Sequence, residues 1–216
     1  HDLRQPLYAL SLFSASLSEL KLDAKGKAVV AQIHDSIAAM EQLFNTLLDI
    51  SRLEAGVVKP EFAAVSVDEL FDQVSNTFWP IAFDAGLDLR FRSDGEWIRT
   101  DPALAGQVIG NLVSNAIRAT SRGGVLVLAR RRAGQVRIEV WDTGRGIATA
   151  DQARIFDEFV QVDNAERDRR KGLGLGLAIV KRSAALIGAQ VTLTSRLGRG
   201  TRVTFLQPAI APPVPT

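Results

Sequence analysis

The sequence predicts an α+β fold, a helical hairpin followed by an α/β sandwich domain, and two patterns support this. In residues 1–22 and 28–55 apolar side chains recur at alternating steps of three and four, which is typical of packed amphipathic helices. From about residue 67 onward helical stretches alternate with short strand-like ones, which is typical of one mixed sheet under a layer of helices. Gly56 and Pro60 stand between the two patterns and predict a break there.

The hairpin carries more apolar residues than two helices can bury. Its seam consists of Leu3, Leu7, Leu10 and Leu17 in the first helix and of Val30, Ile33, Ile37, Met40, Phe44 and Leu47 in the second. We expect residues 23–27, with Gly26 at their centre, to form the turn. Further apolar residues, among them Leu12 and Phe13, widen the stripe, so the sequence predicts a homodimer built on a four-helix bundle.

The chain is expected to divide into four parts. These are the hairpin at 1–55, a connector at 56–66, the sandwich domain at 67–207 and a proline-rich linker tail at 208–216. In the sandwich domain the expected helices are 67–85, 102–120 and 174–187, and the expected strands are 87–92, 96–99, 124–132, 135–141, 190–195 and 201–206.

Composition excludes several classes of function. The net charge of the 216 residues is only +2, so we expect no nucleic-acid partner. The absence of cysteine excludes disulfides, thiolate metal sites and Cys nucleophiles, and is compatible with a cytoplasmic location. No stretch approaches the roughly 20 apolar residues that span a bilayer, so no membrane contact is expected of this piece. Because the chain starts with His rather than Met, we expect it to be a fragment whose longer form could carry an upstream membrane anchor.

Five short segments carry the functional signal. In chain order they are H-D-L-R-Q-P at 1–6, N-L-V-S-N at 111–115, D-T-G-R-G-I at 142–147, F-D-E-F at 156–159 and G-L-G-L-G-L at 172–177. Each is weak alone, but their order and spacing together are specific. The set resembles the catalytic core of bacterial sensor histidine kinases, with an ATP-binding domain of the histidine kinase, gyrase and chaperone type. This resemblance covers nearly the whole chain.

The resemblance implies an ATP-dependent protein histidine autokinase of a two-component system. Such an enzyme transfers the γ-phosphoryl group of ATP to one of its own histidines, here His1, and then to an aspartate of a response-regulator receiver domain. The cofactors implied are ATP and Mg²⁺. The transfer needs the two domains to swing together, so the connector is expected to act as a hinge.

His1 is the expected phosphoacceptor. If the leucines are buried, His1 lies roughly 160° away on the solvent face of its helix. A neutral imidazole is the better nucleophile, and Asp2 is placed to be the general base that takes its proton. Pro6 either loosens the helix beside His1 or is a well-tolerated first-turn proline. Gln5 stands where many members of the family have Thr or Asn, and it is the candidate for a role in phosphatase activity. The other histidine, His34, is interpreted as an ordinary surface residue.

Asn111 and Asn115 are separated by four residues on an expected helix, so both amides share one face. The stripe of Val108, Leu112 and Ala116 beside them should face the core. An amide oxygen is a suitable ligand for Mg²⁺, and the resemblance assigns that role to Asn115. Gyrase-type ATPases carry a Glu at the position of Asn111, where it activates water. Since Asn cannot abstract a proton, the substitution favours transfer to a protein acceptor over hydrolysis.

Asp142 follows an apolar strand and precedes a glycine-rich turn. Its carboxylate can accept a hydrogen bond from the amino group of adenine and would repel the carbonyl of guanine, which favours ATP over GTP. Gly144 and Gly146 are expected to let the backbone approach the base. Thr201, in the G-R-G-T segment that closes the fold, is a further expected nucleotide contact.

Gly172, Gly174 and Gly176 should open a helix whose N-terminus attracts phosphate. Residues 148–171 before them form a long irregular stretch that resembles the ATP lid of the family. Its expected hydrophobic anchor is Phe156 and Phe159. Its basic cluster, Arg167, Arg169, Arg170 and Lys171, is expected to place one cation, with Lys171 as the candidate, near the γ-phosphate.

Two alternatives remain open on the sequence. One is an ATP hydrolase of the gyrase and chaperone type, which Asn111 disfavours and which leaves the hairpin unexplained. The other is a degenerate kinase that binds nucleotide and dimerises as a scaffold, which the intact nucleotide motifs disfavour.

Overall fold

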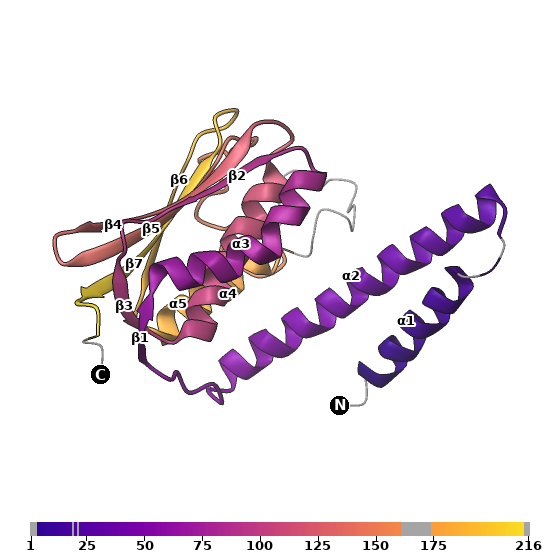
Figure 1. Cartoon of the computed structure of the whole chain (residues 1–216), viewed down its shortest axis with the longest axis horizontal. Coiled ribbons are helices and arrows are strands. Elements are labelled where there is room, and N and C mark those ends of the chain that lie inside the picture. Colours follow the sequence, from indigo (N-terminus) through magenta and orange to yellow (C-terminus); the bar gives the residue numbers. More distant parts are fainter. Residues whose placement is uncertain (1–3, 19, 21, 161–173, 214–216) are drawn as a thin grey trace.

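The structure, a computed structural model, consists of a helical hairpin and an α/β sandwich, as expected (Figure 1). It describes residues 4–18, 20, 22–160 and 174–213. The helices are α1 Arg4–Ser18, α2 Ala24–Glu54, α3 Val67–Asp84, α4 Pro102–Ala119 and α5 Gly176–Leu186. The strands are β1 Ala63–Ser66, β2 Asp88–Arg92, β3 Trp97–Thr100, β4 Gly124–Arg132, β5 Gln135–Asp142, β6 Gln190–Ser195 and β7 Thr201–Ile210. Among the described helices none is both long and apolar enough to span a bilayer.

The second helix of the hairpin begins earlier than the sequence predicts. Asp23 is its N-cap, and the Asp23 carboxylate accepts a hydrogen bond of 2.7 Å from the backbone N–H of Gly26. Gly26 therefore lies in the first helical turn, and the prediction that it sits at the centre of the connecting turn is wrong. The cap explains the difference, because it satisfies a helix donor that a turn would leave to solvent.

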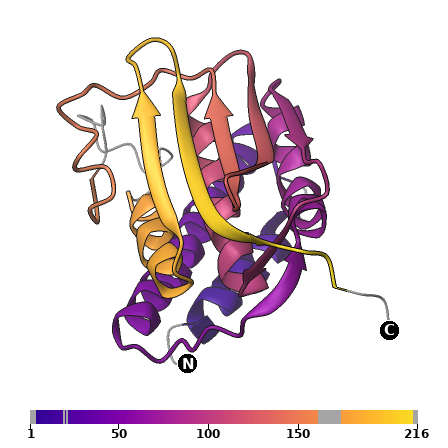
Figure 2. The same cartoon turned by 90° about the vertical axis from the view of Figure 1, so that its left-hand side faces the viewer.

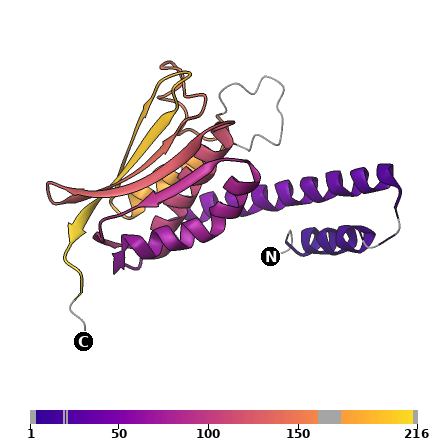
Figure 3. The same cartoon turned by 45° about the horizontal axis from the view of Figure 1, so that its top comes forward.

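The seam of the hairpin is only partly buried in the single chain. Ser14, Val30 and Ile37 are buried between the helices. Larger apolar side chains remain exposed, namely Leu10, Leu12, Phe13, Leu17, Ile33 and Met40. Figures 1 and 3 show the hairpin projecting away from the sandwich, with only the C-terminal part of α2 beside it.

The sandwich contains one mixed seven-stranded sheet. Its strand order is β1-β3-β7-β5-β4-β2. The remaining strand, β6, pairs with residues 201–206 of β7 on the side opposite β5. The β2–β4 pair is parallel and the remaining pairs are antiparallel. Helices α3, α4 and α5 cover one face, whereas no described helix covers the other, which faces the viewer in Figure 2. The expected core stripe of α4, Val108, Leu112 and Ala116, is buried against the sheet.

Two segments that were expected to be linkers belong to the sheet. Residues 63–66 form β1, which pairs with β3 from Ala63 opposite Thr100 to Ser66 opposite Trp97. β7 continues through Pro208 to Ile210. The N–H of Ala209 donates to the carbonyl of Gly134 on the β5 side, so the nitrogen of Pro208 points to the opposite edge, beyond the end of β6. Proline is tolerated there because Pro208 lies between the residues of β7 that pair with β6, 201–206, and those that pair with β3, 209–210, so neither register uses its missing N–H.

Candidate nucleotide site

The two asparagines of α4 lie one turn apart on the same face, as expected. Both are half-buried. The Asn111 side chain donates a hydrogen bond of 3.0 Å to the carbonyl of Gln107. The Asn115 Nδ2 atom is buried and has no hydrogen-bond partner among the described residues. A buried donor without a partner costs roughly 1–3 kcal/mol, which is expected where a ligand completes the bonding.

Gly176, the first residue of α5, faces this amide pair. A Cβ atom at this position would lie 3.2 Å from Nδ2 and 3.3 Å from Oδ1 of Asn115, and 3.6 Å from Oδ1 of Asn111. The N-cap residue Leu175 makes no side-chain hydrogen bond to the helix. The first backbone N–H groups of this helix therefore receive no hydrogen bond from the N-cap side chain. They lie next to the two amides, in a space that is open because residue 176 has no side chain.

Asp142 ends β5 and is held by the start of β7. Its Oδ1 atom accepts hydrogen bonds from the N–H of Gly144 at 2.8 Å and from the N–H of Thr201 at 3.2 Å. Asp142 and Thr201 are 59 residues apart in sequence and are partners in the sheet register. Burial raises the pKa of the Asp142 carboxyl above its usual range, and the two N–H donors oppose that shift.

Gly144 and Gly146 are explained by the packing of the protein itself. A Cβ atom on Gly144 would lie 2.3 Å from the carbonyl oxygen of Ala119, and one on Gly146 would lie 2.1 Å from that of Arg196. Gly146 also has a φ of +69°, which favours glycine. Packing against protein backbone thus explains the lack of a side chain at both positions, and the expectation that they let the backbone approach the base stays a prediction.

Helix α4 links these parts of the site. Its last residue, Ala119, accepts a hydrogen bond from the N–H of Arg145 in the Asp142 turn. Ala119 lies four residues after Asn115, which is about 6 Å along the helix axis. The structure thus brings together the amide pair, Gly176, Asp142 and Thr201, which the sequence predicted separately.

The segment before the glycine-rich stretch differs from the expectation. In its described part, residues 148–160, Ile155 is buried and Phe156 is half-buried. Phe159 is 61% exposed and has a φ of +61°. The prediction that Phe159 is a hydrophobic anchor is therefore wrong, because this left-handed turn directs the ring to solvent. The N–H of Phe159 donates to the carbonyl of Gly174 at 3.1 Å, which joins the lid segment to the glycine-rich stretch that follows it.

Several predicted site residues lie outside the described part of the chain. They are His1, Asp2, Lys171 and Gly172, together with the rest of the basic cluster, Arg167, Arg169 and Arg170. The backbones of Gln5 and Pro6 lie in α1. Their functional roles stay predictions.

The sandwich docks on the end of α2 through contacts that the sequence did not reveal. Leu175 and Ile179 of α5 pack with Ile50 of α2 in a small apolar cluster. Leu175 lies between two glycines of the G-L-G-L-G-L segment. A large apolar residue in a glycine-rich turn was the signal in the sequence that could have indicated this contact. The docking therefore involves the same turn that faces the amide pair.

Polar contacts accompany this cluster. The Gln107 side chain donates to Asp49 of α2 at 3.0 Å and accepts from Ser183 of α5 at 2.9 Å. Arg182 of α5 pairs with Glu54 of α2 at 2.6 Å and also with Glu158. Both sets join residues that are far apart in sequence.

The residues present fit a magnesium nucleotide better than a metal ion alone. No cluster of three or more His, Cys, Asp or Glu side chains that could hold a metal occurs in the described ranges. The site instead offers the amide oxygen of Asn115 beside an orphaned amide donor and an open helix N-terminus. Mg²⁺ is commonly bound by few protein oxygens together with substrate phosphates, so this donor set suits it.

Comparison with known proteins identifies the class. Residues 100–211 match the family of histidine kinase-, DNA gyrase B-, and HSP90-like ATPases, and the chain belongs to this family. Residues 1–56 match the His Kinase A (phospho-acceptor) domain. This order of domains is that of a sensor histidine kinase core.

Individual relatives agree with this class. The chain is 33% identical over 216 residues to the circadian input-output histidine kinase CikA of Synechococcus elongatus, covering 96% of this chain and 29% of the relative. It is 32% identical to the alginate biosynthesis sensor protein KinB of Pseudomonas aeruginosa, covering 96% and 35%. The chain thus spans about a third of these curated relatives.

A solved structure shows the same fold over the whole chain. Full-length ShkA in complex with AMPPNP matches with a TM-score of 0.82 and 32% identity, covering 100% of this chain and 46% of that one. The nucleotide-free catalytic domain of histidine kinase ThkA matches with a TM-score of 0.60 and 27% identity over 68% of this chain and 95% of that chain.

Proposed function

We propose that this chain is an ATP-dependent histidine autokinase of a two-component system. It transfers the γ-phosphoryl group of ATP to His1 and then to an aspartate of a response-regulator receiver domain. The observation that carries the proposal is the unpartnered amide of Asn115 beside Gly176 at an uncapped helix N-terminus. The similarity to ShkA, whose solved structure is a complex with AMPPNP, supports nucleotide binding by this chain.

Each polar group of the site has a role in this proposal. Asn115 holds Mg²⁺ through its amide oxygen, and a bound Mg²⁺ supplies charge neutralisation for the phosphates. Asp142 selects adenine: its Oδ1 is used by backbone donors, and we assign Oδ2 to the adenine amino group. Thr201 fixes Asp142 through its N–H, and Asn111 supports the amide pair.

The first turn of α5 provides phosphate contacts. The backbone N–H groups that follow Gly174 and Gly176 bind anionic oxygens, and the helix dipole adds to the attraction. Phe156 and Lys171 contribute from the lid segment, the former by packing and the latter by charge near the γ-phosphate. Gly144 and Gly146 keep the turn after β5 compact, and Gly172 is assigned to the phosphates together with Gly174 and Gly176.

The transfer step proceeds at the imidazole of His1. A ring nitrogen attacks the γ-phosphorus, the bond from that phosphorus to the β–γ bridging oxygen breaks, and ADP leaves. Asp2 takes or orients the proton on the other ring nitrogen. Gln5 orients a water if the chain also removes phosphate from its partner. Because Asn111 cannot act as a base, water is a poor competitor for the phosphoryl group.

We assign two protein partners to the hairpin and a cytoplasmic location to the activity. A second copy of the chain covers the exposed apolar side chains of α1 and α2 and completes a four-helix bundle. The receiver domain approaches the same hairpin near His1. The docked position of the sandwich on α2 is one stage of the cycle, and the connector before β1 permits the others.

A partition experiment distinguishes the kinase from the hydrolase. The chain is incubated with γ-labelled ATP and Mg²⁺, and label is measured in protein and in free phosphate. The proposal expects label on the protein, lost in Asn115→Ala and retained in Asn76→Ala, a matched change of an exposed asparagine on α3. Release of free phosphate as the dominant product, with unlabelled protein, would support the hydrolase; binding of ATP with neither product would support the scaffold.

A further inference from the structure

The uncovered face of the sheet carries an unusual set of side chains. Alternation along the strands directs Val136, Ile138 and Val140 of β5 into the core, so Arg137, Glu139 and Trp141 point to the opposite face. No helix or strand of the described ranges lies over this face (Figure 2). By the same alternation, β2, β4, β5 and β7 place six arginines on it, namely Arg90, Arg92, Arg130, Arg132, Arg137 and Arg202.

The strand register arranges these arginines around an apolar centre. In one row Arg90 is opposite Leu126, Leu126 is opposite Trp141, and Trp141 is opposite Arg202. Adjacent strands lie about 4.8 Å apart, so the two arginines of this row flank Leu126 and Trp141 across about 14 Å. Trp141 is 40% exposed, which leaves the apolar centre accessible.

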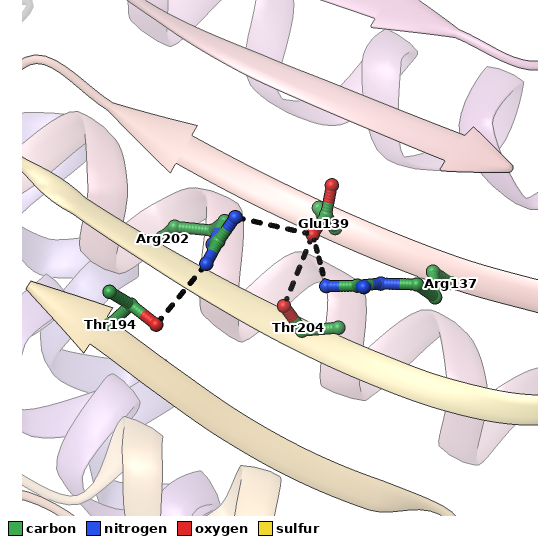
Figure 4. A network of polar contacts seen from close by, with 5 residues as sticks. All are labelled: Arg137, Glu139, Thr194, Arg202 and Thr204. Carbon is green, nitrogen blue, oxygen red and sulfur yellow. Dashed lines mark hydrogen bonds and ion pairs between the residues drawn. The ribbon is translucent and has the colours of Figure 1, made fainter.

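A network holds the middle of the face in one arrangement (Figure 4). Oε1 of the buried Glu139 accepts hydrogen bonds from Arg137 at 2.8 Å and from the Thr204 hydroxyl at 3.4 Å, and it lies 4.0 Å from Arg202. The Arg202 guanidinium also stacks 4.9 Å above the Trp141 ring. These contacts fix two guanidiniums before any partner arrives, which lowers the entropy cost of binding.

We propose that this face, defined by the six arginines with Leu126 and Trp141, is a docking surface for an acidic protein surface. These strands place six arginines and two carboxylates, Asp88 and Glu139, on this face, so the face is complementary to negative charge. Strands β2, β4, β5, β6 and β7 contain no lysine. Arginine and tryptophan are the residues enriched in the centres of protein interfaces, and guanidinium pairs carboxylates in bidentate geometry.

Nucleic acid and membrane are less suited to this face. The face combines arginines with an accessible apolar centre, and Leu126 and Trp141 in that centre match an apolar spot of a partner better than a row of phosphates. The face is a flat sheet with one exposed aromatic ring, and it does not present the amphipathic helix that inserts into a bilayer. A protein surface with carboxylates around an apolar centre satisfies both features.

The test uses the whole chain and a defined probe. The probe is a labelled 15-residue peptide with leucine at every third position and glutamate elsewhere, and binding is measured by fluorescence anisotropy at physiological salt. A peptide with glutamine in place of glutamate, a single-stranded RNA and anionic vesicles are measured in parallel. The proposal expects binding to the acidic peptide, and little to the other three.

Variants decide whether this face is responsible. Arg137 and Arg202 support a buried carboxylate, so the double variant Arg92→Gln with Arg130→Gln is used, since both of its arginines are exposed. It should weaken peptide binding about tenfold, and Trp141→Ala should weaken it at unchanged charge. The control Lys25→Gln with Lys27→Gln removes the same charge from the exposed start of α2 and should change nothing.

Three outcomes would overturn the proposal. These are equal peptide binding by all variants, preferential binding of RNA or vesicles, and loss of the chain's own dimer in the Arg92 and Arg130 variant. The last would show that a second copy occupies the face. Far-UV circular dichroism and thermal midpoints establish that each variant is folded, so a loss of binding is not a loss of fold.

Discussion

Replacing Gly176 with alanine should weaken nucleotide binding without weakening the fold. The added Cβ would lie 3.2 and 3.3 Å from the two polar atoms of the Asn115 amide, closer than most Cβ contacts. The amide must therefore shift by a few tenths of an ångström, and the methyl group would occupy the space assigned to phosphate. Loss of one good contact to an anionic oxygen is about 1.5–3 kcal/mol, so we expect affinity for ATP to fall by about tenfold or more.

The same substitution should not destabilise the protein. Gly176 begins α5 and does not have a positive φ, so alanine suits its backbone. Alanine in place of a helical glycine stabilises by up to about 1 kcal/mol. Affinity for a non-hydrolysable ATP analogue is measured by calorimetry, and stability is measured by urea unfolding.

Gly106→Ala is the matched control. Gly106 lies within α4, where a Cβ atom would meet nothing within 4 Å. It should gain similar stability and leave nucleotide affinity unchanged. Unchanged affinity in Gly176→Ala would refute the placement of phosphate beside Asn115. A large loss of stability in Gly176→Ala would show that the glycine serves packing instead.

Three further changes test other parts of the site and fold. Asp142→Asn should weaken ATP binding and shift the preference toward GTP, since the amide can donate to the guanine carbonyl. It should also raise the free energy of unfolding at neutral pH, because burial raises the pKa of the Asp142 carboxyl and so disfavours its ionised form. Gly200 has a φ of +88°, and a Cβ atom there would lie 1.9 Å from the carbonyl oxygen of Asp142. Gly200→Ala should therefore lower the free energy of unfolding in urea by about 2–4 kcal/mol. The control Gly198→Ala, where a Cβ atom meets nothing within 4 Å, should lower it by about 1 kcal/mol. Phe13→Glu, at a side chain 67% exposed in the single chain, should leave the fold intact and abolish the dimer in sedimentation velocity.

The pH dependence of the Asp142 effect has a definite sign. The folded state holds the carboxyl proton more tightly than the unfolded chain does. The stability from this protonated group is fully present below its usual pKa of 3.8 and is lost as pH rises through the folded pKa. The advantage of Asp142→Asn should therefore appear above that pKa and vanish in acid, and an advantage that grows as pH falls would contradict the burial argument.

Each of the other two predictions can also be contradicted by a definite result. Equal losses in Gly200→Ala and Gly198→Ala would mean that the turn relaxes around the added atom. A persistent dimer in Phe13→Glu would mean that the exposed side chains of the hairpin are not the interface.

Local patterns were sufficient to predict most helices and strands of this chain. The amide pair and the core stripe of α4 follow from helical spacing alone, and the structure places them as expected. β1 escaped prediction because four residues, Ala63–Ser66, show no clear alternation and become a strand only by pairing with β3. Strand formation at a sheet edge depends on a neighbour that is distant in sequence.

The remaining differences also arise from tertiary contacts. The hydrogen bond from Gln107 to Asp49 joins residues 58 positions apart in the sequence, and no local sequence pattern predicts it. Gly144 is in a recognised motif, yet the lack of a side chain there is explained by the carbonyl oxygen of Ala119, which a Cβ atom would meet at 2.3 Å. Phe159 was expected to be buried from its chemistry, whereas its positive φ turns it outward. Residue type and spacing were sufficient to propose the residues of the nucleotide site, whereas their arrangement in space depends on tertiary packing.

Mapping the phosphorylated residue tests the central claim most directly. The chain contains two histidines, His1 and the exposed His34 on α2, and each is followed by an aspartate. After incubation with γ-labelled ATP and Mg²⁺, with and without a helical extension ahead of residue 1, the acid-labile, alkali-stable label is located by mass spectrometry. We predict label on His1 that His1→Gln removes and His34→Gln leaves. Label that persists in His1→Gln, or that maps to His34, would contradict the account.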